Sequence, residues 1–233
     1  MPRASDYLTS PRSVELRRNM VDRQLRTFDI TNDDVLDAVL RTPREPFVNS
    51  EPDSLVYSDA NLIVKGAQAA RPLLAPMFVA RALQMAEVTP SDRVLDVAGG
   101  AGYSAAIAAR LCQSLVALED DDAFVARSGE AFQDLGLSNA RSVRADIAAG
   151  PHGDAIFDVI LINGAIETRP DALLARLAEG GRLLAVEAGD GRERAGSRFV
   201  LFTRSGATFG MRPLFGAVAN VLPAFAAKPE FVF

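Results

Sequence analysis

The stretch VLDVAGGAGYSAAIAARL, residues 94–111, decides the fold class of this 233-residue chain. It begins with apolar residues, holds three glycines at its centre and ends in an alanine-rich run. This order predicts a buried strand, a tight turn and a helix. Glycines in such a turn permit positive φ and leave no Cβ to obstruct a ligand, and backbone N–H groups face the crevice. The stretch therefore predicts a ligand site at the carboxyl end of a strand.

From Arg93 onward, strand patterns alternate with helix patterns. Strands are expected at 93–99, 114–119, 140–146, 155–164 and 182–189, with helices at 103–112, 121–136 and 169–181. Residues 197–218 then read as two strands joined by a Ser-Gly turn, an antiparallel hairpin. The alternation predicts right-handed crossovers and a mostly parallel α/β sheet. A parallel sheet closed by a hairpin resembles the class I methyltransferase fold, which is Rossmann-like, more than a dinucleotide dehydrogenase.

The N-terminal third lacks this alternation and reads as mainly helical. Residues 1–12 are expected to form a loose arm, and Ser13 to cap a helix over 14–28. Further helices are expected at 31–42 and 75–88, with loops and short extended pieces over 50–75. We expect one structural domain overall: an N-terminal arm and helical extension, residues 1–80, packed on a ligand-binding core, residues 81–233.

Composition restricts the function classes. The formal net charge is −5 and the isoelectric point about 5.0, so sequence-independent nucleic-acid binding is not expected. Cys112 and His152 are the single cysteine and histidine, which excludes a disulfide framework and metal sites that need several such ligands. No signal-peptide pattern and no long apolar run is visible, so a cytoplasmic protein without a membrane partner is expected.

An acid at the end of the next strand strengthens the ligand interpretation. Glu119 stands 17 residues after Gly102 and 23 after Asp96, close to the spacing at which an acid accepts hydrogen bonds from ribose hydroxyls. Alternatively, the glycines form only a tight turn and Glu119 begins a solvated acidic run. Because Gly100, Gly102 and Ala105 also satisfy the G-x-G-x-x-G/A pattern, NAD stays open on this stretch. The helical N-terminal third and the closing hairpin favour another ligand.

Several segments together resemble one family. VLDVAGGAGYSAA, VALE, FDVILINGA and LLARLAEGGRLLAV are similar to protein-L-isoaspartate O-methyltransferases, as are the lead-in MVDRQLRTFDITNDDVLDAVLRTPREPFV and the segment YSDANLIV. The glycine turn is shared by class I methyltransferases in general, whereas the lead-in is specific to this family. The resemblance runs from about Met20 to the hairpin.

This resemblance implies S-adenosylmethionine as cofactor and methyl transfer to a carboxyl oxygen of a protein or peptide. Glu119 would hold the ribose diol and Asp146 would meet the adenine amino group. The implied cofactor-binding residues are Asp96, Ala98, Gly99, Gly100, Gly102, Glu119, Asp120, Asp146 and Asn163. For Asn163, capping of the next helix is the alternative role.

The chain departs from the family pattern at three places. Ala98 stands where the family has a glycine, and Ala145-Asp146-Ile147 replaces Gly-Asp-Gly. The loop that reads roughly Gly-Gln-Thr-Ile-Ser-Gln-Pro in the family is KGAQAARPLLAP here, residues 65–76. Depending on the end from which one counts, Ala70 or Leu74 takes the place of the serine, so the hydroxyl is lost.

The loss of this hydroxyl concerns the methyl acceptor rather than the cofactor. Lys65 and Arg71 are the candidates for holding an acceptor carboxylate, and Arg71 could bind it with two hydrogen bonds. Alternatively, both are solvated loop charges. The sequence leaves open the true acceptor, the oligomeric state, and a regulatory cofactor-binding role without catalysis.

Overall fold

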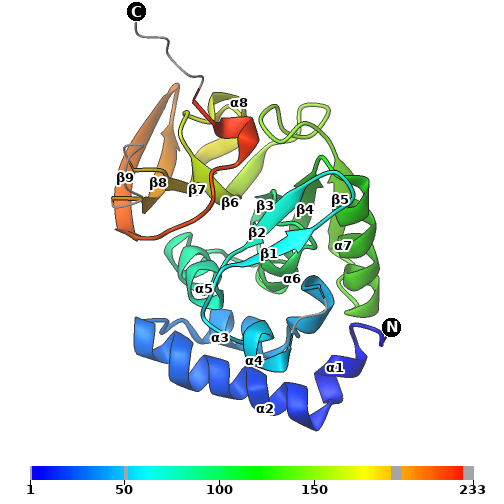
Figure 1. The fold of residues 1–233 in the computed structure, drawn as a ribbon. Coiled ribbons are helices and arrows are strands. Elements are labelled where there is room, and N and C mark those ends of the chain that lie inside the picture. The colour runs from blue at the N-terminus through cyan, green and yellow to red at the C-terminus, as the bar shows by residue number, and fades with distance from the viewer. Residues whose placement is uncertain (1, 50–51, 190–195, 228–233) are drawn as a thin grey trace, which may run out of the picture.

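A seven-stranded sheet forms the centre of the computed structural model, which describes residues 2–49, 52–189 and 196–227 (Figure 1). The strand order is β5-β4-β3-β6-β7-β8-β9; β5 to β7 run parallel, and β8 and β9 are antiparallel to their preceding neighbours. The strands are β3 (Arg93–Val97), β4 (Ser114–Glu119), β5 (Ala140–Arg144), β6 (Phe157–Ile166), β7 (Leu177–Glu187), β8 (Arg198–Ser205) and β9 (Thr208–Gly216). The predicted fold class, a mostly parallel α/β sheet with an antiparallel C-terminal hairpin, is confirmed.

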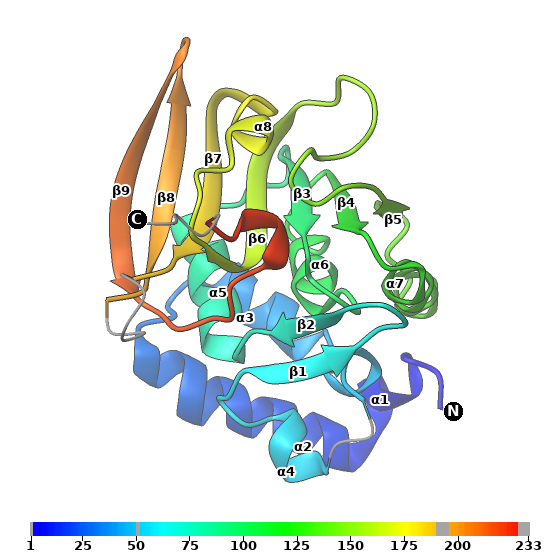
Figure 2. The same ribbon diagram turned by 45° about the horizontal axis from the view of Figure 1, so that its top comes forward.

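The N-terminal third is helical, as predicted, and also carries a small hairpin. Its helices are α1 (Asp6–Thr9), α2 (Pro11–Met20), the π-helical turn η1 (Val21–Leu25), the 3-10 turns η2 (Arg26–Phe28) and η3 (Glu45–Phe47), α3 (Asp33–Leu40), α4 (Asp53–Val56) and α5 (Pro76–Met85). The antiparallel strands β1 (Leu62–Lys65) and β2 (Ala70–Leu73) lie between α2 and the strands β3 to β5 in both ribbon views (Figure 2).

Alternating side chains of the central strands feed two separate hydrophobic clusters. Val94 belongs to the first cluster, which takes in apolar side chains of α3, α5, α6 (Tyr103–Ala108) and α7 (Asp122–Asp134). Leu95 belongs to the second, which is covered by the one-turn helix α8 (Asp171–Leu174) and by the 3-10 turn η4 (Pro223–Phe225). Both faces of β3, β4 and β6 are thus buried, which explains their nearly continuous apolar sequences.

Two local predictions are wrong. The segment 169–181 forms only the single turn α8, because Leu177 already pairs with Phe157 as the first residue of β7. The next paired residue is Arg182, so the glycines in between lie in an irregular bulge of that strand, with Gly180 at φ +70°. The prediction for the N-terminus is wrong as well: α1 lies in the arm 1–12, and α2 begins at Pro11, so Ser13 lies inside that helix and does not cap it.

Arg17 fixes this N-terminal arm, and its loss is expected to destabilise the protein. The side chain is 3% exposed and donates hydrogen bonds to the carbonyl oxygens of Tyr7, Leu8 and Leu40. Arg17→Met would leave these buried acceptors without a charged donor, so we expect about 3 kcal/mol less free energy of unfolding. Urea denaturation measures it, with the exposed neighbour variant Arg18→Met as control. Equal losses in the two variants would contradict this role.

Candidate functional site

The glycine turn lies at the point where the chain connections diverge. From β3 the chain continues to β4 and β5 on one side, whereas β6, the other neighbour of β3, leads to β7 on the opposite side. The carboxyl ends of β3 and β6 therefore lie at the point where the strand order reverses, the usual ligand position in open α/β sheets. Here Ala98, Gly100 and Gly102 adopt φ values of 58°, 60° and 94° before α6 begins.

Ala98 adopts a left-handed conformation that costs an L-residue about 1–2 kcal/mol and glycine nothing. Its side chain is fully buried and belongs to the hydrophobic cluster of Leu95 and Val97. The methyl group thus packs in the core on the second face of the sheet.

Asp96, near the end of β3, carries a buried carboxylate. It is 1% exposed, and neither carboxylate oxygen has a hydrogen-bond partner among the described residues. Burial raises the pKa of this carboxyl to about 6, although the nearby Asn163 and Ser104 side chains lower it in part. A buried acceptor without a donor costs folding free energy, so such an atom indicates a group that binds there.

Glu119 lies across the turn from Asp96, at the end of β4. Its Oε1 accepts a 2.6 Å hydrogen bond from the backbone N–H of Gly100, and its side chain is 3% exposed. Burial raises its pKa to about 7, and the charge of Arg71 opposes that rise. Glu119 thus lies at the glycine turn with which the sequence paired it, because parallel neighbours end at the same edge of the sheet.

Arg71 lies inside this site. Its Nε is 3.2 Å from Glu119 Oε2, and its Nη2 donates to Asp120 Oδ1. With the Arg71 side chain 5% exposed, the interpretation of Arg71 as a solvated loop charge is wrong. Lys65, the second candidate, is exposed on β1.

The sequence did not single out Asp121, which joins the same site to the β1–β2 hairpin. Its Oδ2 accepts hydrogen bonds from the backbone N–H groups of Gln68, at 2.6 Å, and Ala69, at 2.9 Å. Its Oδ1 accepts from Ala123 N and so caps α7. An acid just before a helix is a recognisable N-cap signal, but its second partner, 53 residues away, leaves no local pattern.

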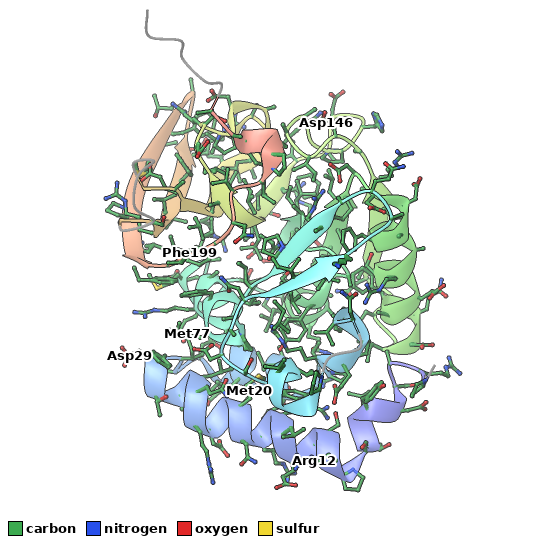
Figure 3. All side chains as sticks on the ribbon, viewed as in Figure 1. Arg12, Met20, Asp29, Met77, Asp146 and Phe199 are labelled. Carbon is green, nitrogen blue, oxygen red and sulfur yellow. The ribbon has the colours of Figure 1, made fainter. Side chains whose placement is uncertain are left out.

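Asp146 lies just after β5, and Asn163 lies within β6. Asp146 is exposed on the loop after β5, at the upper edge of the molecule in Figure 3, and its Oδ1 accepts from Ala148 N and Ala149 N. Asn163 is buried and donates to the carbonyl oxygen of Val97 at 3.2 Å. Since β6 continues to Ile166, Asn163 does not cap a helix. Its amide instead lies beside Asp96.

Hydrogen bonds with Arg44 and Asn61 fix the loop that is expected to face the methyl acceptor. Leu74 is buried, and its carbonyl oxygen accepts from Arg44, a fully buried guanidinium stacked 4.8 Å above the Tyr103 ring centroid. Asn61 Oδ1 accepts from Ala75 N at 2.8 Å. Arg44 and Asn61 were not predicted, because nothing in the sequence marks which carbonyl or amide they reach.

The residues present fit a nucleoside cofactor with a cationic amino-acid part. Asp96 offers two buried acceptors to an ammonium group, and Glu119 at the turn offers a carboxylate to hydroxyls. Two cavities, of about 500 and 590 Å³, lie elsewhere: the first is between α7 and the N-terminal segment, and the second is between α7 and β5. Within the part of the chain that the structure describes, no cluster of metal ligands and no helix long and apolar enough to span a membrane occurs.

Comparison with known proteins gives consistent results. Residues 16–198 match the sequence model of the family Protein-L-isoaspartate(D-aspartate) O-methyltransferase (PCMT). A protein of Shewanella sediminis named protein-L-isoaspartate O-methyltransferase 2 is 31% identical over 222 residues, 94% of this chain and 87% of that protein. A protein-L-isoaspartate O-methyltransferase of Koribacter versatilis is 35% identical over 72% of this chain and 74% of its own length.

Solved structures agree in fold. A protein-L-isoaspartate O-methyltransferase superposes with a TM-score of 0.77 at 22% identity, over 88% of this chain, which spans 65% of that longer chain. A beta-aspartate methyltransferase of Plasmodium falciparum, solved in complex with S-adenosyl-L-homocysteine, gives 0.71 at 20% identity, over 89% of this chain and 98% of its own.

Proposed function

The chain belongs to the protein-L-isoaspartate(D-aspartate) O-methyltransferase family, and from this premise we propose that it transfers a methyl group from S-adenosylmethionine to a carboxyl oxygen of a protein or peptide. Because the chain belongs to this family, S-adenosylmethionine and not NAD is the proposed cofactor. Bound S-adenosylmethionine supplies an electrophilic methyl group on a sulfonium. The observation in this chain that carries the proposal is the buried Asp96 carboxylate without a partner, next to the glycine turn.

Each residue around the glycine turn has a part in the proposal. Asp96 would accept hydrogen bonds from the cofactor ammonium, and Glu119 from the ribose hydroxyls. The backbone of Gly100 would lie against the ligand, since it has no Cβ. At Gly102, by contrast, a Cβ would lie 2.8 Å from the Cβ of Ser128, so this proposed site residue also serves the packing of the turn on α7. Asp120, Asp146 and Asn163, with Ala98 and Gly99, complete the proposed set.

The part of the site proposed for the methyl acceptor lacks the serine hydroxyl of the family pattern. Methyl transfer to a carboxylate gains mainly from alignment of the oxygen with the methyl group and from exclusion of water. Lys65 and Arg71 carry the positive charges on the hairpin next to the site, and we propose them as the groups that attract the acceptor carboxylate. We also propose that the protein is cytoplasmic. Fractionation of cells tests this location.

Glu119→Ala tests the ribose contact. We expect binding of S-adenosylhomocysteine to weaken by roughly 1.5–3 kcal/mol, the contribution of charge-assisted hydrogen bonds. Isothermal titration calorimetry measures the affinity, and Glu130→Ala, an exposed acid on α7, is the control. Unchanged affinity in a folded Glu119→Ala protein would show that the ribose is not held there.

A further inference from the structure

A side chain of the protein itself fills the ribose end of the proposed cofactor site. Arg71 occupies Glu119 Oε2, and its guanidinium also pairs with Asp120. A Cβ placed on Gly100 would lie 3.2 Å from the Cβ of Arg71 and 3.7 Å from a ring carbon of Phe124. The stem of Arg71 therefore covers the surface that Gly100 leaves open. One arginine occupies both the carboxylate and the glycine surface proposed for the cofactor.

The same hairpin is fixed a second time, at its turn. Asp121 binds the backbone N–H groups of Gln68 and Ala69. A Cβ placed on Gly66 would lie 2.5 Å from Asp121 Oδ2, so the turn of the hairpin packs directly on this carboxylate. Three consecutive acids, from the last residue of β4 to the N-cap of α7, thus hold one short hairpin at two points.

We propose that these contacts form a latch that closes the cofactor site, and that S-adenosylmethionine and Arg71 compete for Glu119. The latch comprises Arg71 with Glu119 and Asp120, and Asp121 with Gln68 and Ala69. The inference rests on the proposed function, because it needs a cofactor ribose at Glu119. The stem of Arg71 lies against Gly100 while its Nε bonds to Glu119 Oε2, so the side chain fills the space between the turn and the carboxylate that the ribose needs. Arg71 must leave when the ribose binds.

The latch lowers the apparent affinity for the cofactor, since only molecules with the open hairpin bind it. A group that loosens the latch without touching the ribose acceptor therefore raises the affinity. This separates Arg71 from Glu119: loss of Glu119 removes the ribose contact, whereas loss of Arg71 removes only its competitor. The two variants are expected to change the affinity in opposite directions.

Calorimetry with S-adenosylhomocysteine tests the competition. Arg71→Met keeps most of the apolar stem and removes the charge, and we expect binding at least tenfold tighter than in the wild type. Asp121→Asn weakens the latch at the hairpin turn, where Asp121 Oδ2 accepts from Gln68 N and Ala69 N, and should bind about threefold tighter; it serves as the test if Arg71→Met does not fold. Arg93→Met is the control, because its ion pair with Asp158 involves the opposite end of β3. We expect no change there.

Hydrogen exchange on the wild-type protein gives an independent readout. Saturating S-adenosylhomocysteine should speed exchange of the Gln68 and Ala69 amides at least tenfold, the reverse of ordinary ligand protection. Slower or unchanged exchange, or equal or weaker binding by a folded latch variant, overturns the latch while the cofactor assignment stands. If neither the wild type nor any latch variant binds S-adenosylhomocysteine, the proposed function fails and the latch with it.

Discussion

Gly100→Val is expected to abolish binding of S-adenosylhomocysteine, with an affinity at least a hundredfold below that of the wild type. Gly100 has a φ of 60°, where a β-branched residue is strongly disfavoured. The new side chain would also point at the surface that Arg71 covers in this structure and that the ligand needs. Calorimetry measures the loss, and circular dichroism establishes that the variant is folded.

The chain offers a matched control for this substitution. Gly136 has a similar φ of 67°, but a Cβ placed there meets nothing within 4 Å. Gly136→Val should therefore lose stability through backbone strain and keep full binding. Normal binding by a folded Gly100→Val protein would mean that the turn is only structural and that the cofactor lies elsewhere.

Methyl transfer to an isoaspartyl peptide is expected to be slow, on the order of a hundredfold below a family member that has the serine hydroxyl. Ala70 and Leu74, the two residues that can occupy its place, offer no hydroxyl, and Leu74 is buried. A displacement of the acceptor by about 1 Å is enough for a rate loss of this size. A radiolabelled transfer assay on the isoaspartyl peptide, beside its aspartyl twin, measures it.

Two variants refine this test. Ala70→Ser places a hydroxyl on the exposed start of β2, and Leu74→Ser places one in the buried loop. A rise in turnover for one of them identifies the position that faces the acceptor. Rapid turnover of the isoaspartyl peptide by the wild type would contradict the expectation and would assign acceptor positioning to Arg71, Lys65 or backbone amides.

Strand β3 and the glycine turn after it could be predicted because their signals are local. An apolar run, a cluster of glycines and an acid some twenty residues later place Gly100 and Glu119 together, and the 2.6 Å hydrogen bond between them follows from parallel pairing. The segment 169–181 failed for the opposite reason. Its leucines have helical spacing, but Leu177 is paired with Phe157 in the sheet, and that pairing overrides local propensity.

The sequence by itself determined the order of strands and helices, the closing hairpin, the family and the acids at the strand ends. Only the tertiary structure decided what those acids bind. Arg71 reaches Glu119 across 48 residues and Asp121 reaches Gln68 across 53, and the sequence pattern around each is that of an ordinary loop charge or helix cap. Periodicity reports which face of an element is buried, whereas the partner of a buried charge depends on how distant elements pack.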